Sequence, residues 1–132
     1  MDAGTRASVR RRAVECCEYC QRRQIDSPLI PLQIEHIIAR KHGGPDSLDN
    51  LALACAECNL HKGSNLSGID PESDRLTPLY HPRRDLWHAH FAWAGVRIIG
   101  LTALGRTTVR VLDLNAPARL QVRMATRLEY RV

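Results

Sequence analysis

Two cysteine pairs with the same spacing, Cys17/Cys20 and Cys55/Cys58, constrain the fold more than any other feature of the sequence. Each C-x-x-C pair folds into a tight knuckle that aims both sulfurs at one point, so two knuckles supply the four thiolates of a tetrahedral Zn²⁺ site. Paired disulfides or free thiols are the alternatives, although five cysteines are an odd number for a disulfide framework. Cys16 is left over as a buried or partly exposed spectator. The pattern therefore predicts structural zinc.

The segment between the two pairs, residues 21–54, is longer than the spacer of a small zinc ribbon. A closed four-thiolate site has no open coordination position, so the zinc is expected to hold the fold while any reaction takes place elsewhere. Within this segment the run LQIEHIIARKHGG, residues 32–44, places Glu35 and His36 side by side among apolar residues. Because a charged pair is costly to bury, we infer that these two residues have a function.

Periodicity and turn residues predict an α+β protein with one domain, residues 1–132, and without internal repeats. We expect a zinc-bearing core at 15–65 and a C-terminal α/β extension at 78–132. The predicted elements are a helix at 5–15, a loop at 21–31, strands at 32–38 and 51–54, a helix at 55–63, a long loop at 64–82, a helix at 82–91, two short strands around 94–95, and helices at 102–112 and 117–129.

Positive charge is concentrated at the C-terminal end of the chain. The formal net charge is +5, and residues 101–132 hold six arginines against Asp113 and Glu129. Four of these arginines recur every four residues and would form a basic stripe on the last helix: Arg119, Arg123, Arg127 and Arg131. Such a surface suits a phosphate-rich partner, because neutralising phosphates releases condensed counterions. A solvated basic face without a partner explains the charge equally well.

No apolar run approaches the roughly 18 residues that are needed to cross a bilayer, and Met1 does not begin a charged and then apolar leader. We therefore expect a cytoplasmic protein without a membrane partner. The sequence does not fix the oligomeric state.

Four stretches occur in one order along the chain: CEYC (17–20), EHIIARKHGG (35–44), LDNLALAC (48–55) and CAECNLHKG (55–63). Together they make the chain resemble the HNH endonuclease family over roughly Cys17 to Gly63. The pattern of that family is an acidic residue plus histidine on a first strand, a central asparagine, and a histidine or asparagine on a following helix. The resemblance implies a ββα-metal core stapled by zinc, here preceded by an N-terminal helix.

The resemblance also implies roles for four residues. His36 would be the general base that takes a proton from the attacking water, and imidazole suits this because it exchanges protons near neutral pH. Glu35 and Asn59 would bind the catalytic divalent cation. Asn50 would fix the loop that positions His36. Glu35 stands where aspartate is more usual and Asn59 where the family has its last histidine, which makes the site rich in oxygen and favours Mg²⁺ or Mn²⁺.

Neighbours on a regular strand point to opposite faces, so Glu35 and His36 can address one phosphate only where the strand ends or bulges. We therefore predict irregular backbone at this pair. Four further residues are candidate phosphate contacts: Lys62, His61, Lys41 and His42. A plain surface lysine is the alternative for Lys62, and a solvated or zinc-adjacent position is the alternative for His61, which points away from Asn59 on a helix.

The predicted function is metal-dependent hydrolysis of phosphodiester bonds in nucleic acid, with DNA as the expected substrate. The first alternative is a non-catalytic, zinc-finger-like module that binds nucleic acid. The set Glu35, His36, Asn50 and Asn59 argues against it, because binding alone requires none of them. A purely structural or protein-binding zinc domain is a second alternative, which leaves the basic tail unexplained.

Overall fold

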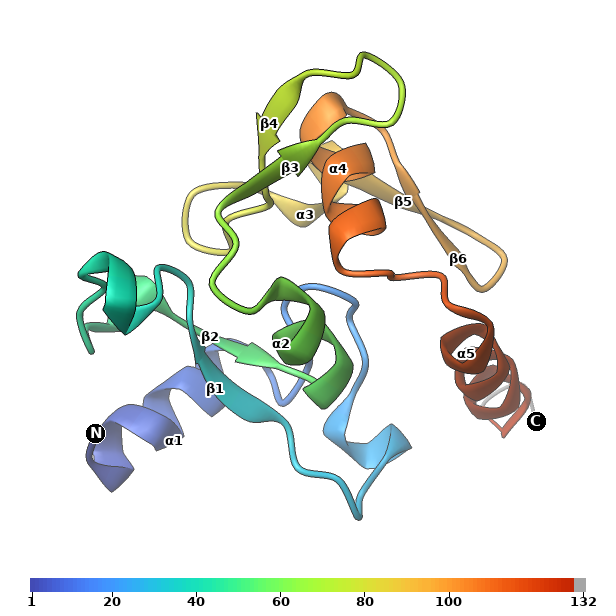
Figure 1. The fold of residues 1–132 in the computed structure, drawn as a ribbon. Coiled ribbons are helices and arrows are strands. Elements are labelled where there is room, and N and C mark those ends of the chain that lie inside the picture. Colours follow the sequence, from blue (N-terminus) through green and yellow to red (C-terminus); the bar gives the residue numbers. More distant parts are fainter. Residues whose placement is uncertain (130–132) are drawn as a thin grey trace.

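A computed structural model describes residues 1–129, in which helices alternate with three two-stranded antiparallel sheets (Figure 1). The N-terminal half contains α1 (Ala3–Arg12), β1 (Gln33–His36), β2 (Leu51–Ala54) and α2 (Ala56–Lys62). The C-terminal half contains β3 (Ser67–Ile69), β4 (Leu76–Pro78), α3 (Trp87–His90), β5 (Phe91–Ala94), β6 (Arg97–Gly100), α4 (Ala103–Val111) and α5 (Pro117–Glu129). Short 3₁₀ helices η1 (Gln24–Asp26), η2 (Arg40–His42) and η3 (Leu48–Asn50) lie in the connections. The predicted α+β class is confirmed.

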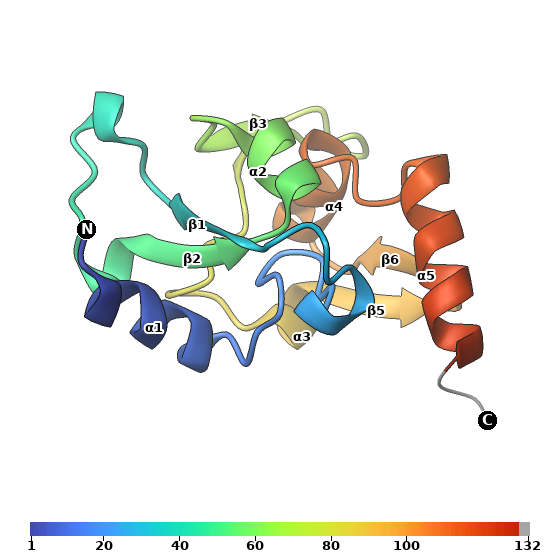
Figure 2. The same cartoon turned by 90° about the horizontal axis from the view of Figure 1, so that it is seen from below.

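The β1–β2 hairpin and α2 form a ββα unit in the N-terminal half. Gln33 pairs with Ala54 and His36 pairs with Leu51, so the two strands match along their full length. All four residues of β2 are buried, and α1 packs along this strand (Figure 2). The Arg12 guanidinium fixes α1 there by donating to the Leu51 carbonyl at 2.6 Å. This order of elements is the one expected from the sequence.

Helix α1 begins and ends earlier than the predicted 5–15. It begins at Ala3 because the Asp2 carboxylate caps it, accepting the Thr5 N–H at 2.7 Å. It ends at Arg12 because Val14 and Glu15 have φ angles of 54° and 53°, a conformation that the helix cannot continue through. These two residues turn the chain into the first cysteine knuckle.

Residues 64–82, predicted as a long loop, contain the β3–β4 hairpin instead. Strands of three residues are too short to show a detectable alternation of apolar and polar residues. The hairpin is held against α4, since the Asp70 carboxylate accepts two hydrogen bonds of 3.0 Å from Arg106. Gly68 also faces α4, where a Cβ atom would stand 2.6 Å from Val111 Cγ2.

The helix predicted over 82–91 is also shorter, because α3 spans only Trp87–His90. The Asp85 carboxylate accepts the His81 N–H at 2.9 Å and keeps the preceding residues in a turn. The two strands predicted around residues 94 and 95 are confirmed as β5 and β6, and Gly95 turns between them with a φ of 61°. The last two predicted helices are confirmed as α4 and α5.

One hydrophobic core joins the two halves of the chain. Its members come from α1, the residues that flank β1, strand β2 and the C-terminal half, and include Val9, Leu51, Leu53, Trp87, Phe91, Ile98 and Leu112. The indole N–H of Trp87 donates to the Tyr19 carbonyl at 2.8 Å, which ties α3 to the first knuckle. Within residues 1–129, no helix has the length and apolar character needed to span a membrane.

The basic stripe predicted on α5 turns toward the protein. Arg119 is buried, and Arg123 and Arg127 are half-buried. Arg123 and Arg127 donate to backbone carbonyls of the β5–β6 turn, Val96 and Gly95 respectively. The solvated-face interpretation is therefore wrong for these three arginines, and Arg131 lies outside the described residues.

Candidate active site and zinc cluster

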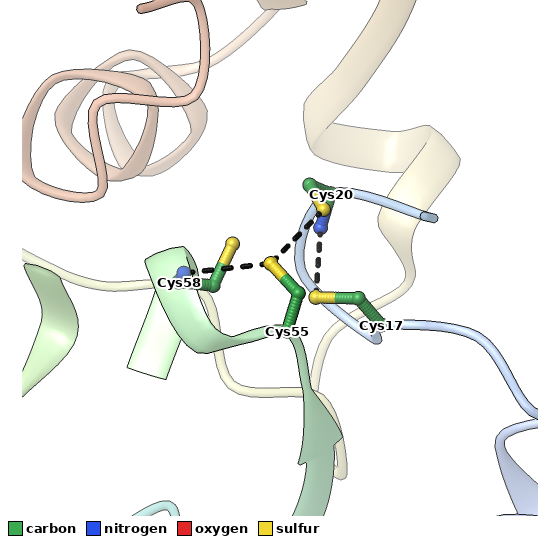
Figure 3. A group of neighbouring side chains, drawn as sticks. All are labelled: Cys17, Cys20, Cys55 and Cys58. Carbon is green, nitrogen blue, oxygen red and sulfur yellow. Dashed lines mark hydrogen bonds between the residues drawn. The ribbon is translucent and has the colours of Figure 1, made fainter. Parts of the chain in front are cut away.

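The four paired cysteines meet at one point in the interior. Cys17 and Cys20 come from the turn after α1, while Cys55 precedes α2 and Cys58 lies in its first turn (Figure 3). All four are buried, and their sulfur atoms lie within 4.8 Å of one another. The Cys20 and Cys55 sulfurs are 3.7 Å apart. Two thiolates bound to one tetrahedral Zn²⁺ at about 2.3 Å lie about 3.8 Å apart, so the cluster fits zinc.

Backbone N–H groups orient the sulfurs within each knuckle. The Cys20 N–H donates to Cys17 Sγ and the Cys58 N–H donates to Cys55 Sγ, both at 3.5 Å (Figure 3). Burial raises the pKa of the Cys17 and Cys58 thiols well above the usual range. Zinc would displace those protons, because it binds thiolates. Cys16 Sγ faces the Val14 carbonyl at 3.3 Å and lies outside the cluster, as the sequence predicts for the spare cysteine.

His36 ends β1 on the opposite side of the ββα unit from the buried strand face. Its Nε2 atom lies 2.6 Å from Asp46 Oδ1, and Arg40 donates to the same oxygen at 3.1 Å. The hydrogen bond from His36, followed by that from Arg40, lowers the pKa of the Asp46 carboxyl. A carboxylate that accepts Nε2–H leaves the lone pair of the neutral ring on Nδ1.

Asp46 is the partner that the sequence analysis missed. It stands ten residues after His36, in the glycine-rich connection, and neither helical nor strand periodicity relates the two positions. Only the path of the connection brings them together. Its single sequence signal is an acidic residue after the pair Gly43-Gly44, which marks a turn without naming a partner for its side chain.

Asn50 holds that connection in shape. Its Oδ1 accepts the Ile38 N–H at 2.9 Å, and its Nδ2 donates to the Ile38 and Pro45 carbonyls at 3.0 and 2.9 Å. Gly44 must be glycine, because a Cβ atom there would lie 1.7 Å from the Ile38 carbonyl oxygen. Asn50 is 5% exposed, so its side chain acts on the loop that carries Asp46 and not on a substrate.

β1 ends at His36, one of the two irregularities that the sequence allowed, but Glu35 and His36 themselves keep regular strand geometry and no bulge separates them. Both residues keep strand register, opposite Ala52 and Leu51, and pairing continues with the Ile37 N–H donating to the Asn50 carbonyl at 2.9 Å. The two side chains therefore point to opposite faces. The two side chains have different partners on these two faces: Glu35 contacts α2 through Lys62, and His36 contacts Asp46 of the following loop. Glu35 and His36 consequently cannot both address one phosphate from this conformation.

Glu35 faces α2, where it forms a buried ion pair. Its Oε1 atom lies 2.6 Å from Lys62 Nζ, and Lys62 also donates to the Ile37 carbonyl at 2.8 Å. Glu35 is 4% exposed and Lys62 is 2% exposed. Burial raises the pKa of Glu35, while Lys62 and then Tyr19 oppose that rise. The prediction of Lys62 as a phosphate contact is wrong, because a side chain this deeply buried cannot reach a ligand in solvent.

Asn59 lies on the same side of β1 as Glu35 but is partly exposed. Its Nδ2 donates to Gln33 Oε1 at 2.6 Å. As folded, Glu35 and Asn59 do not offer a divalent cation an open site, because the ammonium of Lys62 already takes the Glu35 carboxylate. Among the described residues, the group of histidine, cysteine and acidic side chains placed to hold a metal is the cysteine cluster.

The remaining candidate residues are exposed. Lys41 and His42 lie on η2, in the connection that carries Asp46. His61 lies two residues beyond Asn59 on α2 and lines a groove beside the zinc cluster, together with Cys20. His61 therefore has the zinc-adjacent position, while Lys41 and His42 lie in the connection that follows His36.

Replacing Lys62 with methionine is expected to lower the free energy of unfolding by about 3–5 kcal/mol, because the Glu35 carboxylate would stay buried without its counter-charge. Urea unfolding of zinc-loaded protein measures this. The double variant Glu35→Leu/Lys62→Met removes both charges and should recover most of the loss. A Lys62→Met protein within about 1 kcal/mol of wild type would show that the pair is as weak as an exposed ion pair.

The family model described as HNH endonuclease matches residues 17–65 of the chain. No curated protein and no solved structure matches it. The matched segment begins at the first zinc knuckle and contains β1, β2 and α2. It also contains His36, Asp46 and Asn50. Residues 17–65 are therefore similar to an HNH endonuclease domain, and they carry four cysteines positioned to form a zinc site.

Proposed function

We propose that this chain is an HNH-type endonuclease that hydrolyses phosphodiester bonds in DNA, with His36 as the general base. The observation that supports this most directly is the contact of 2.6 Å between His36 Nε2 and Asp46 Oδ1. Asp46 holds one ring nitrogen and Asn50 holds the loop of Asp46, and in this proposal the other nitrogen of His36 takes a proton from water. A binding module has no use for this arrangement.

A nucleic-acid substrate is supported by the charge around His36. Arg40, Lys41 and His42 form η2, which begins after a connection of three residues from the end of β1, and all three are exposed. We propose that Lys41 and His42 contact the phosphate backbone beside the cleaved bond, while Arg40 keeps Asp46 in place. The net charge of +5 favours association with any polyanion and does not distinguish DNA from RNA.

Mg²⁺ or Mn²⁺ belongs to the proposal because HNH nucleases commonly use a divalent cation. The conformation described here argues against Glu35 as its ligand, since Lys62 occupies that carboxylate at 2.6 Å. This ion pair also favours a second candidate function, a zinc-stabilised module that binds nucleic acid without cleaving it.

A plasmid-nicking assay separates the two functions. Supercoiled DNA is incubated with zinc-loaded protein and Mg²⁺, Mn²⁺ or no added cation, and an identically purified His36→Ala protein is the blank. Conversion to the nicked circle by wild type alone is the expected result. Retarded migration of a DNA duplex without any nicking, under either cation, would favour the binding module. Cleavage of a matched RNA and not of DNA would keep the nuclease and change its substrate.

A further inference from the structure

Helix α5 lies outside the HNH segment, yet one of its side chains reaches the zinc cluster. Arg119 Nη2 lies 2.9 Å from Cys58 Sγ and 3.7 Å from Cys55 Sγ. Arg119 Nη1 donates to the Leu112 carbonyl at 3.0 Å, at the end of α4. The guanidinium thus bridges the second knuckle and the C-terminal half of the chain.

The chemistry of the cluster explains why a cation lies there. Zn²⁺ bound by four thiolates carries a double negative charge, and burial makes an unbalanced charge costly. The knuckle N–H groups that contact Cys17 and Cys55 are neutral dipoles. Arg119 supplies a full positive charge at hydrogen-bonding distance from Cys58. Because the guanidinium is planar and has several N–H donors, its Nη1 can donate to the Leu112 carbonyl at the same time.

The rest of α5 provides little apolar anchoring. Among its residues from 117 to 127, Arg119 is the one that is buried, while Val122 and Met124 are 37% and 55% exposed. Arg123 and Arg127 bind the β5–β6 turn and stack over Trp93, with 5.7 and 4.6 Å from guanidinium carbon to ring centre. Both of these arginine side chains are half-buried. Among residues 117–127, the fully buried attachment of α5 therefore runs through Arg119, whose guanidinium contacts the Cys58 and Cys55 sulfurs.

Helix α5 also covers one side of the cluster. A groove of 690 Å³ between α5 and the first knuckle is lined by Cys20 and Arg119 among others. Movement of α5 away from this groove would expose the sulfurs to solvent and to chelators.

We infer that the zinc-thiolate cluster docks α5 through Arg119, so that zinc retention and α5 docking are coupled. With zinc bound, the cluster is anionic and holds the guanidinium. Without zinc, nothing gathers the four sulfurs at one point, Arg119 loses the fixed acceptor that it contacts at Cys58 Sγ, and α5 detaches. Coupling between two equilibria is reciprocal, so whatever detaches α5 must also weaken zinc retention. The inference rests on the cysteine cluster and does not depend on nuclease activity.

Zinc release to a chromogenic chelator tests one direction of the coupling. Arg119→Met, which keeps the length of the side chain without its charge, is expected to accelerate release at least about tenfold, the range seen when a contact to a metal ligand is lost. Arg119→Lys keeps the positive charge but not the planar guanidinium with its several N–H donors. Its rate of zinc release should lie between those of Arg119→Met and wild type. Arg110→Met removes the same charge from an exposed position on α4 and should release zinc at the wild-type rate.

Hydrogen exchange of the α5 amides tests the other direction. The α5 amides of zinc-loaded wild type should be protected, and chelation should remove that protection. Arg119→Met should expose α5 while zinc is still bound, and Arg110→Met should not. If Arg119→Met does not fold, Arg119→Lys is compared with wild type in both assays. Release and exchange rates within about twofold of wild type, or a change in one without the other, would overturn the coupling.

Discussion

Zinc removal is expected to unfold the ββα unit. Its strands have four residues each and α2 has seven. A two-stranded hairpin is marginal by itself, and an isolated helix shorter than about 12 residues is not stable in water. Zinc contributes about 10–16 kcal/mol in zinc-finger peptides, which is comparable to the whole stability of a typical domain, about 5–15 kcal/mol. The shared core with the C-terminal half cannot replace a contribution of this size.

Thermal unfolding followed by circular dichroism, with metal content measured on the same samples, checks this expectation. Chelated protein should lose the wild-type transition, and added Zn²⁺ should restore it. Cys20→Ser removes one ligand and should behave like the chelated protein. Cys16→Ser is the matched control, because Cys16 lies outside the cluster, and should unfold like wild type. An unchanged midpoint in protein shown to be free of metal would exclude a structural role for zinc.

The sequence predicted the ββα unit well because its signals are local. Two C-x-x-C pairs have a spacing that few structures other than a metal site use, and LQIEHII and LALA are short apolar runs of strand type. Each C-x-x-C pair and each apolar run is a contiguous stretch shorter than about ten residues, so it can be recognised without knowing the path of the chain. The β3–β4 hairpin has no such signal, because its strands are three residues long and contain Gly68 and Pro78, which disfavour strands.

The partners of charged side chains were not predictable from the sequence. Lys62 was expected to contact phosphate or to be a plain surface lysine, both of which need an exposed side chain, yet it is 2% exposed beside Glu35. Periodicity placed Arg119 on a helical stripe but could not say which face of α5 meets the protein. Asp46 reaches His36 through an irregular loop. In all three cases the contact depends on the path of the chain between elements, which neither composition nor spacing encodes.

Replacing His36 with alanine is expected to reduce the rate of DNA nicking by about 10²–10⁴-fold, the usual contribution of a general base. The loss should appear in the turnover rate more than in DNA affinity, because the exposed Lys41 and His42 that would hold the phosphates are unchanged. The fold should survive, since Asn50 holds the loop through contacts to Ile38 and Pro45 that do not involve the histidine. Single-turnover nicking of plasmid by zinc-loaded protein measures the effect.

Two further variants show whether the loss comes from the base itself. Asp46→Asn keeps the shape of the partner but removes its negative charge, so it should reduce nicking by less than His36→Ala. His88→Ala removes an exposed histidine from α3 and should leave nicking unchanged. If His36→Ala cleaves at the wild-type rate, a general base at the end of β1 is excluded. Zinc content and DNA affinity are measured on the same proteins. If both are unchanged, that result would show that the fold is intact and that another side chain is the general base.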